Sequence, residues 1–315
     1  MTLSEPRLVS VIIPCYNQGR YLGEAITSAL GQGYDDLEVI VVDDGSTDHT
    51  AEVAGRYARV SCVRQSNRGL AAARNRGLEA SRGEYAVFLD ADDRLAEGAI
   101  EAGAASLDSH PDCAFVSGHY RLIDAEGRAM PHSATSCAES DYYDAMLRRN
   151  YIGMHATVMY RRSVLEIVKG FDTSRRACED YDLYLRIARS FPVHCHHRVV
   201  AEYRQHGGNM SRDYALMMRS SLSVLRSQRQ FVRGDEKLER AYREGIKFWR
   251  DYCAGGLIRQ VKDCLGLREW RNALAGSLTL LRHHPRAFTR GIAPGLMRKA
   301  FRRAMLLSSR SSLML

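Results

Sequence analysis

The sequence lacks the features that mark several common classes of protein. Its 315 residues include eight cysteines but no Cys-x-x-Cys pair, and no run of 18 apolar residues occurs. No segment at the start combines a basic stretch with an apolar centre, as a secretory leader would. These absences argue against a small disulfide-stapled domain and against a chain that spans a membrane. We therefore expect reduced thiols in a cytoplasmic protein.

The charge is only weakly one-sided, with 45 Lys and Arg against 37 Asp and Glu. A net charge of +8 permits anionic partners such as nucleotide phosphates or acidic lipid headgroups, but it selects none of them. The basic residues are spread along the chain and no basic motif interleaved with aromatic residues appears, so we expect no nucleic-acid partner. With 45% hydrophobic residues, the chain can form a sizeable core.

Short β-branched runs alternate with helical patterns in the first part of the chain. We expect strands at 7–14, 37–42, 60–65 and 84–90, separated by helices at 19–29, 47–58 and 69–81. Such alternation predicts right-handed βαβ units and an α/β fold with a mostly parallel sheet flanked by helices. Ligands bind beyond the carboxyl ends of the strands in sheets of this kind, and the polar residues that follow these strands should meet there.

After residue 212 the strand-like runs stop. We expect one domain over 1–212 and a helical C-terminal region over 213–315, with helices near 214–232, 236–265, 267–284 and 294–308. The last of these, "GLMRKAFRRAMLL", places apolar residues on one face and basic residues on another. It could lie on an anionic membrane, or it could pack its apolar stripe on the domain with its arginines in solvent.

Two pairs of carboxylates follow predicted strands. In "FLDADD", Asp90 and Asp92 are two residues apart, and in an extended chain they would point the same way and suit a divalent cation near a phosphate. Alternatively, Asp92 or Asp93 caps a helix that begins near Arg94. In "VVDDGS", one aspartate can form an Asx turn, which leaves the other to accept a hydrogen bond from a nucleotide base or a ribose.

Three further side chains are candidates with equally simple structural alternatives. Asp180, in "ACEDYDLYLRIARS", is either the N-cap of a helix or a general base at the start of that helix. His206, in the loop "YRQHGGN", is either a metal or phosphate ligand or an exposed loop histidine. His155 could touch an acceptor, although a packed or surface histidine is the more ordinary interpretation.

These segments together resemble the family 2 glycosyltransferases with the GT-A fold. The resemblance is carried by "VSVIIPCYNQGRYLGEAITSALGQGYDDLEVIVVDDGSTDHT", "NRGLAAARNRGLEASRGEYAVFLDADD" and "GFDTSRRACEDYDLYLRIA", in that order, and covers about residues 7–212. It implies a nucleotide-sugar donor, a divalent cation (Mn²⁺ or Mg²⁺) and transfer with inversion at the anomeric carbon.

The resemblance also implies roles for residues around the nucleotide. Asp43 resembles the carboxylate that reads the base, with Asp44 beside it. Pro14 and Tyr16 begin the loop expected to line the nucleotide pocket, and Arg74 matches the arginine expected near the base or phosphates.

The remaining implied roles concern the metal and the chemistry. Asp90 and Asp92 match the DxD motif, with Asp92 expected on the metal and Asp90 on the ribose, the sugar or the metal. His206 stands where many members have a histidine near the diphosphate, and we expect it to join the metal ligands. Asp180 matches the catalytic base of the "ED" motif, in which Glu179 precedes it as a second catalytic candidate.

The sequence departs from the processive members of the family, because the QxxRW motif is absent. We therefore expect transfer of a single sugar, with a UDP-sugar as donor and a glycan or lipid-linked hydroxyl as acceptor. Two other functions stay open. A nucleotidyltransferase would show a Gly-rich phosphate loop, which "PCYNQGRY" matches poorly. A non-catalytic nucleotide-sugar sensor or scaffold would keep the fold and use the C-terminal helices for interaction.

Overall fold

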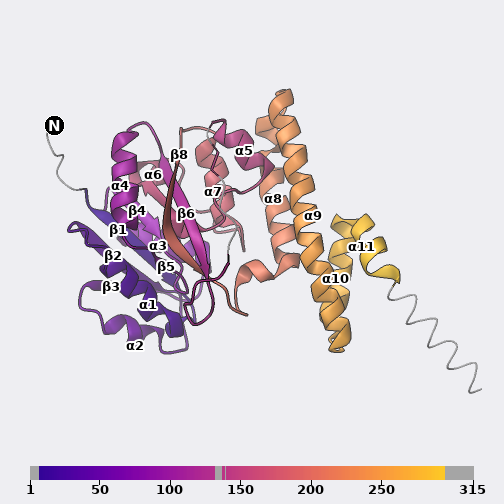
Figure 1. Cartoon of the computed structure of the whole chain (residues 1–315), viewed down its shortest axis with the longest axis horizontal. Coiled ribbons are helices and arrows are strands. Elements are labelled where there is room, and N and C mark those ends of the chain that lie inside the picture. Colours follow the sequence, from indigo (N-terminus) through magenta and orange to yellow (C-terminus); the bar gives the residue numbers. More distant parts are fainter. Residues whose placement is uncertain (1–6, 132–136, 139, 295–315) are drawn as a thin grey trace, which may run out of the picture.

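The computed structural model describes residues 7–131, 137–138 and 140–294, and Figure 1 shows its arrangement. One eight-stranded sheet has the order β3-β2-β1-β4-β7-β6-β8-β5. Helices cover the sheet, and a separate helical layer (orange to yellow in Figure 1) stands beside it. The strands are β1 Val9–Cys15, β2 Leu37–Asp43, β3 Val60–Arg64, β4 Tyr85–Phe88, β5 Arg94–Leu95, β6 Phe115–Ile123, β7 Val158–Arg161 and β8 His194–Arg204.

The predicted α/β fold is confirmed, and its first half follows the predicted alternation. Strands β3, β2, β1 and β4 pair in parallel, and the residues of β1 and β4 are all buried. The helices of this half are α1 Gly19–Leu30, α2 Thr50–Gly55, α3 Leu70–Ala80 and α4 Ala99–Ser109. Because parallel strands run the same way, the residues that follow β1, β2 and β4 meet at one edge.

The second half of the sheet is mixed in direction. Strand β7 is antiparallel to both β4 and β6, whereas β6 and β8 pair in parallel. The two-residue β5 pairs with β8, so the chain after Asp93 enters a strand. The prediction of a helix that begins near Arg94 is therefore wrong. The shorter helices of this half are α5 Tyr142–Arg148, α6 Arg162–Ile167 and α7 Glu179–Ala188, with 3₁₀ turns at His155–Thr157 and Met210–Arg212.

The helical layer matches the predicted helices closely. It consists of α8 Tyr214–Val232, α9 Glu236–Gly266, α10 Trp270–His283 and α11 Pro285–Gly291. The short α11 was not predicted, and the helix expected at 294–308 lies outside the described residues but for its first one. Among the helices that the structure describes, none is both long enough and apolar enough to cross a membrane.

The helical layer shares its core with the sheet domain. Tyr181 of α7 packs against Trp249 of α9, with ring centroids 5.7 Å apart, and its hydroxyl donates a hydrogen bond to the Met146 carbonyl. One cluster of buried side chains runs from Ile12 in β1 to Leu280 in α10. The proposed boundary at 212/213 therefore marks a change in secondary structure across one continuous core.

The prediction of eight reduced cysteines is wrong for two of them. Cys137 and Cys195 form a disulfide, with their Cα atoms 5.8 Å apart. That separation lies within the range that a disulfide can bridge. The two residues are 58 positions apart in the chain, so no local pattern announces the pair. The other six cysteines are free.

Substitutions at two glycines of α9 test how closely this helix packs against α5. A Cβ at Gly245 would overlap the carbonyl oxygen of Leu147 in α5, whereas Gly255 has no neighbouring atom within 4 Å of that position. We predict that Gly245→Ala lowers the free energy of unfolding by about 1–3 kcal/mol through overpacking. Gly255→Ala, the matched control, should raise it by up to about 1 kcal/mol, because alanine favours the helix. If urea unfolding gave the same change in the free energy of unfolding for both variants, close packing of α9 against α5 would be contradicted.

Candidate functional site

Polar side chains gather where β1, β2 and β4 end. The loops after β1 and β2 are joined by Asn17, whose Oδ1 accepts from the Thr47 N–H at 2.8 Å and whose N–H donates to the Ser46 Oγ at 3.0 Å. Asp48 then accepts from the N–H groups of Gly19 and Thr50, the first residues of α1 and α2. These contacts fix the loop that Asp43 and Asp44 begin.

Asp43 is the last residue of β2 and is 1% exposed. Its Oδ1 accepts from the Ser46 N–H at 2.8 Å, which closes the turn. Its Oδ2 accepts no hydrogen bond from any described residue and lies 3.4 Å from the Nε of Arg64. A buried carboxylate oxygen without a hydrogen-bond donor is costly to maintain. It is therefore ready to accept an N–H group from a ligand.

Asp44 is buried beside it but is fully occupied. Its Oδ1 accepts from Gln65 Nε2 at 2.7 Å and from the Arg68 N–H at 2.9 Å. Its Oδ2 accepts from the Gly69 N–H at 2.8 Å. Asp44 thus holds the 65–69 loop in place, and its carboxylate supports the pocket wall through these contacts.

The chain from Asp90 to Asp93 forms a turn, closed by the Asp93 N–H donating to the Asp90 carbonyl at 3.0 Å. The expectation of an extended segment is therefore wrong. So is the expectation that Asp92 or Asp93 caps a helix, because the Asp93 Oδ1 instead accepts from the Arg204 N–H at 2.8 Å. Burial, and then the neighbouring carboxylates, raise the pKa values of Asp92 and Asp93. The turn concentrates negative charge that favours a cation.

Asp92 and His206 meet across this turn. The Asp92 Oδ2 lies 2.9 Å from the His206 Nε2, and both side chains are largely buried. The Gly208 N–H donates to the other ring nitrogen, Nδ1, at 3.1 Å and orients the imidazole. Because Nδ1 accepts, the Nε2 carries the ring proton and donates it to Asp92, so this proton must leave before the pair could hold a divalent cation at adjacent positions about 3.0 Å apart. His206 is not an exposed loop histidine.

Arg74 connects the turn to α7. Its side chain is 2% exposed and donates to the Asp90 Oδ1 at 2.7 Å and to the Glu179 Oε1 at 2.5 Å. The ring of Phe171 lies 5.5 Å from its guanidinium carbon. Burial lowers the pKa of Arg74, but the carboxylates of Asp90 and Glu179 more than reverse this, and the pKa is raised. The guanidinium therefore stays charged and fixes the positions of both carboxylates.

Asp180 lies at the start of α7 but is not its N-cap. Cys178 is the N-cap, in a left-handed conformation with φ of 60°, and Asp180 is the second helical residue. Its Oδ1 accepts from the Tyr181 N–H at 2.7 Å. Burial, and then the charge of Glu179, raise the pKa of Asp180 to about 7. A carboxyl group with such a pKa can accept and return a proton near neutral pH.

The remaining residues singled out from the sequence are Pro14, Tyr16 and His155. Pro14 is buried in β1, and Tyr16 follows that strand with its side chain 48% exposed, so its ring is available to a ligand. His155 is 3% exposed and packs against Phe88 and Phe171, which confirms the packed interpretation of this residue.

Arg204, the last residue of β8, also belongs to the site but was not predicted from the sequence. Its fully buried guanidinium donates to the carbonyl oxygens of Asp92 at 2.7 Å and Ala125 at 3.0 Å, and pairs with Glu24 at 2.7 Å. It therefore braces the turn that carries Asp92. The only local signal was its position two residues before His206.

Similarity to known proteins covers at least half of this chain. The family model for glycosyl transferase family 2 matches residues 10–168. A chondroitin synthase of Escherichia coli is 31% identical over 219 residues, 67% of this chain and 31% of that protein. An uncharacterized glycosyltransferase of Haemophilus influenzae is 34% identical over 184 residues, 56% of this chain and 70% of that protein. The chain thus spans less than a third of the first relative and over two thirds of the second.

Solved structures share the fold. TarS 1-349 of S. aureus in complex with UDP has a TM-score of 0.59 at 20% identity, over 87% of this chain and 81% of that one. The mannosyltransferase PcManGT of Pyrobaculum calidifontis, in complex with GDP-Man and Mn²⁺, has a TM-score of 0.59 at 19% identity, over 97% of this chain and 81% of that one. At these identities the likeness concerns the fold alone, which is that of the GT-A glycosyltransferases.

We predict that Arg74→Met lowers the free energy of unfolding by about 3–5 kcal/mol, because it leaves buried Glu179 without its counter-charge. Adding Glu179→Gln should restore part of the loss, and urea unfolding of both single variants and the double variant measures that coupling. Arg76→Met is the matched control on α3, where an exposed pair with Glu79 is worth at most about 1 kcal/mol. Additive losses from Arg74→Met and Glu179→Gln would contradict the buried pair.

Proposed function

Since this chain belongs to glycosyl transferase family 2, we propose that it is an inverting enzyme for single-sugar transfer. It takes the sugar from a nucleotide-sugar, which we propose is a UDP-sugar, and passes it to a hydroxyl group of a glycan or lipid-linked acceptor. The proposal rests on the ion pairs from the half-buried Asp90 through the buried Arg74 to Glu179, which tie the candidate donor site to Asp180.

We assign donor binding to the edge where β1, β2 and β4 end. The Oδ2 of Asp43, which accepts no hydrogen bond from a described residue, accepts an N–H group of the base, and the exposed ring of Tyr16 covers its face. Asp90 faces the ribose or sugar with the oxygen that Arg74 does not hold. Asp92 and His206 would hold the divalent cation. When bound, such a cation supplies Lewis-acid stabilisation of the charge on the departing diphosphate.

Asp180 is the proposed general base. Its raised pKa, about 7, gives it the affinity for a proton that removal of a hydroxyl proton requires near neutral pH. The oxygen of the acceptor then attacks the anomeric carbon from the face opposite the diphosphate. One displacement inverts that carbon without a covalent intermediate on the protein. The charge of Glu179 raises the pKa of Asp180, and the Arg74 guanidinium, which pairs with Glu179, acts in the opposite direction and lowers it.

The donor base and the number of sugars are finer proposals. The UDP complex of TarS favours uridine, whereas the GDP-Man complex of PcManGT keeps guanosine as the second candidate. The missing QxxRW motif favours single transfer. Six free cysteines favour a reducing compartment, and we place the enzyme in the cytoplasm.

We propose that the acceptor is carried at a membrane surface, which α10 contacts. Leu267, Trp270, Leu274, Leu278 and Leu281 form one face of this helix and its preceding turn, each between 49% and 73% exposed. The exposed Arg271 and Arg282 lie beside this stripe at helical spacing. Exposed tryptophan and leucine flanked by arginine is typical of a helix that lies in an anionic lipid interface.

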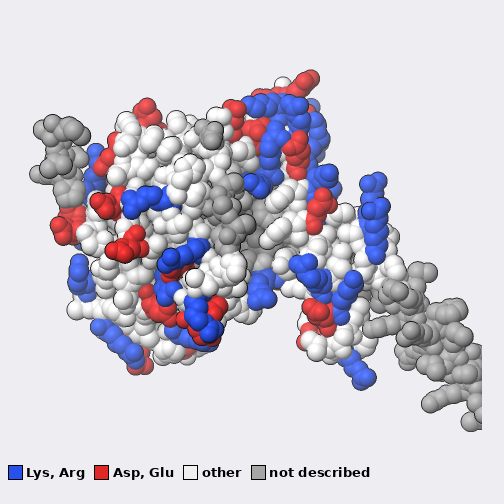
Figure 2. Space-filling view, in the orientation of Figure 1, with Lys and Arg blue, Asp and Glu red and all other residues white. Residues whose placement is uncertain are grey.

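The charge of the whole helical region supports the same partner. Residues 213–315 contain 21 Lys and Arg but only 8 Asp and Glu, whereas residues 1–212 are net acidic. Figure 2 shows several groups of Lys and Arg, with some Asp and Glu between them, on the helical part of the face in view. A cleft of about 1400 Å³ between these helices is lined by Arg226, Arg229, Arg233, Arg243, Lys247 and Arg250. Such a cleft suits the phosphate groups of a lipid-linked acceptor.

We predict an acid limb in the pH profile of turnover. Release of nucleoside diphosphate from UDP-sugars with Mn²⁺ should rise with pH and level off above about 7, as Asp180 loses its proton. Asp180→Asn should lower the rate by about 10²–10⁴ and leave donor binding in place. Asp172→Asn, an exposed carboxylate paired with Arg175, is the control that should keep the limb.

Two outcomes would contradict this assignment. If Asp180→Asn kept its turnover, another group would be the base. If no nucleotide-sugar were turned over, while a donor still raised the melting temperature, the protein would be the non-catalytic sensor or scaffold.

Membrane contact is tested by co-sedimentation with vesicles. We predict binding to vesicles that contain phosphatidylglycerol and little binding to phosphatidylcholine alone. Trp270→Ser with Leu274→Ser should lose at least about tenfold in partitioning, because each side chain contributes about 1.5–3 kcal/mol when buried. Ile167→Ser, 64% exposed on α6, is the control that should change nothing. Equal binding of both variants, or no binding by the parent protein, would contradict the proposal.

A further inference from the structure

Strands β6 and β8 are distorted where they run side by side. Ser117 pairs with Cys195, but two residues further along β6, His119 pairs with Val199. Strand β8 therefore contains two extra residues in this interval. Such bulges turn side chains away from their regular alternation. Here the extra residues include His197, which is exposed and lies beside His119.

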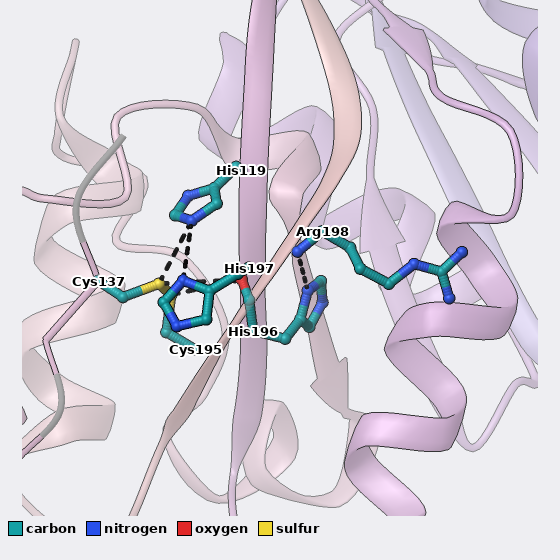
Figure 3. The surroundings of a disulfide bond; sticks show 6 residues. All are labelled: His119, Cys137, Cys195, His196, His197 and Arg198. Carbon is teal, nitrogen blue, oxygen red and sulfur yellow. Dashed lines mark hydrogen bonds between the residues drawn. A yellow bond between two sulfur atoms is a disulfide. The ribbon is translucent and has the colours of Figure 1, made fainter. Parts of the chain in front are cut away.

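Figure 3 shows what the distortion brings together. The His119 Nε2 lies 3.4 Å from the His197 Nδ1, and the Cys137 Sγ lies 3.8 Å from the His119 Nε2. The ligand atoms of these three residues all lie within 4.8 Å of one another. Cys195 joins the group through its disulfide with Cys137. His196 points the other way, where its Nδ1 accepts from the Arg198 N–H at 3.3 Å.

These separations match a tetrahedral zinc site. With Zn–N distances of about 2.05 Å and Zn–S distances of about 2.3 Å, two nitrogen ligands lie about 3.4 Å apart, and a sulfur lies about 3.6 Å from a nitrogen. Two histidines and two cysteines form one of the common structural zinc sets. Among the described residues, this is the one group of three or more His, Cys, Asp or Glu side chains whose ligand atoms lie close enough to hold a metal ion.

We propose that His119, His197 and Cys137 bind Zn²⁺ when the disulfide is reduced, with the Cys195 thiolate as the fourth ligand. The Cα atoms of the two cysteines, 5.8 Å apart, allow the sulfurs to separate by side-chain rotation. The site is distinct from the edge that carries Asp92 and His206. It would fix the chain at Cys137 to β6 and β8.

The disulfide and the zinc site are alternative states of the same sulfurs. Reduction by a dithiol or phosphine takes two electrons and two protons into the disulfide and leaves two thiols. Each thiol then releases its proton to solvent as its sulfur binds the ion, and each imidazole binds through its unprotonated nitrogen. A single disulfide among six free thiols is unusual for a chain in a reducing compartment, whereas a zinc site is common there.

The test uses the full chain, purified with and without a phosphine reductant and supplied with Zn²⁺ or Co²⁺ alone. The reduced protein should retain one more zinc per chain through gel filtration than the oxidised protein. The Co²⁺ form of the reduced protein should show the visible bands of a tetrahedral ion and thiolate-to-metal charge transfer. Asp92 and His206 cannot produce this charge transfer, because neither has a thiolate. The oxidised protein should show neither the bands nor the charge transfer. Equal zinc retention by the oxidised and reduced proteins would overturn the proposal, as would a Co²⁺ form without thiolate charge transfer.

Single variants assign the ligands. Cys137→Ser should abolish the charge transfer and the zinc content of the reduced protein, and Cys195→Ser should weaken both. His196→Gln is the matched control on β8 and should keep both signals. Thermal unfolding of each variant in chelator shows whether it is folded, and the Co²⁺ spectrum of the parent protein decides the proposal even if a variant does not fold. Full zinc content in folded Cys137→Ser would overturn the assignment.

Discussion

The buried guanidinium of Arg74 holds together the two segments that form the site. It lies between two carboxylates from segments about 90 residues apart, Asp90 in the turn after β4 and Glu179 at the start of α7. Burying one positive charge requires counter-charges nearby, and burying Glu179 requires a cation. The same ion pairs therefore set the distance between the proposed donor edge and Asp180, and they keep that distance fixed without a ligand.

Both the parallel half and the mixed half of the sheet contribute residues to the proposed donor edge. The parallel half brings the ends of β1, β2 and β4 together, and the mixed half adds the end of β8, from which Arg204 braces the turn carrying Asp92. His206 follows two residues later and completes the pair with Asp92. Asp43 ends a strand and Asp180 lies in the first turn of α7, so both are held on rigid elements, as the positioning of reacting groups requires.

The helical layer gives the molecule two surfaces of different character. The net acidic sheet domain carries the buried carboxylates, and the net basic helices carry a row of exposed leucines with Trp270. The helices share a continuous core with α5 and α7, so a surface that the helices touch is held at a fixed distance from Asp180. A membrane-carried acceptor would thereby be presented to the same edge each time.

Features with a local pattern were predictable from the sequence. The β-branched runs predicted β1 and β2, and the period of apolar residues predicted α8 and α9 nearly to the residue. The strand ends predicted that Asp43 and Asp90 would lie at the same edge of the sheet. Whether those residues bind donor and metal stays a prediction.

Features that depend on contacts far apart in the sequence were not predictable. The insertion of β7 between β4 and β6 is one such feature, and the burial of Arg204 is another. The Asp90–Asp93 turn was missed because alternation was assumed beyond the end of the strand. The cluster of His119, Cys137, Cys195 and His197 was missed because a bulge, which has no sequence signature here, creates it.

We propose that Asp43, Asp92 and His206 form a metal-dependent site for a nucleoside diphosphate. Calorimetric titration of UDP and GDP into the protein, with and without Mn²⁺, measures this binding and its dependence on the metal. One nucleotide should bind much more tightly with Mn²⁺, and Asp92→Asn should remove the gain from the metal while weak metal-free binding remains. Binding that ignores Mn²⁺, or an Asp92→Asn protein that still responds to the metal as the parent does, would contradict the account.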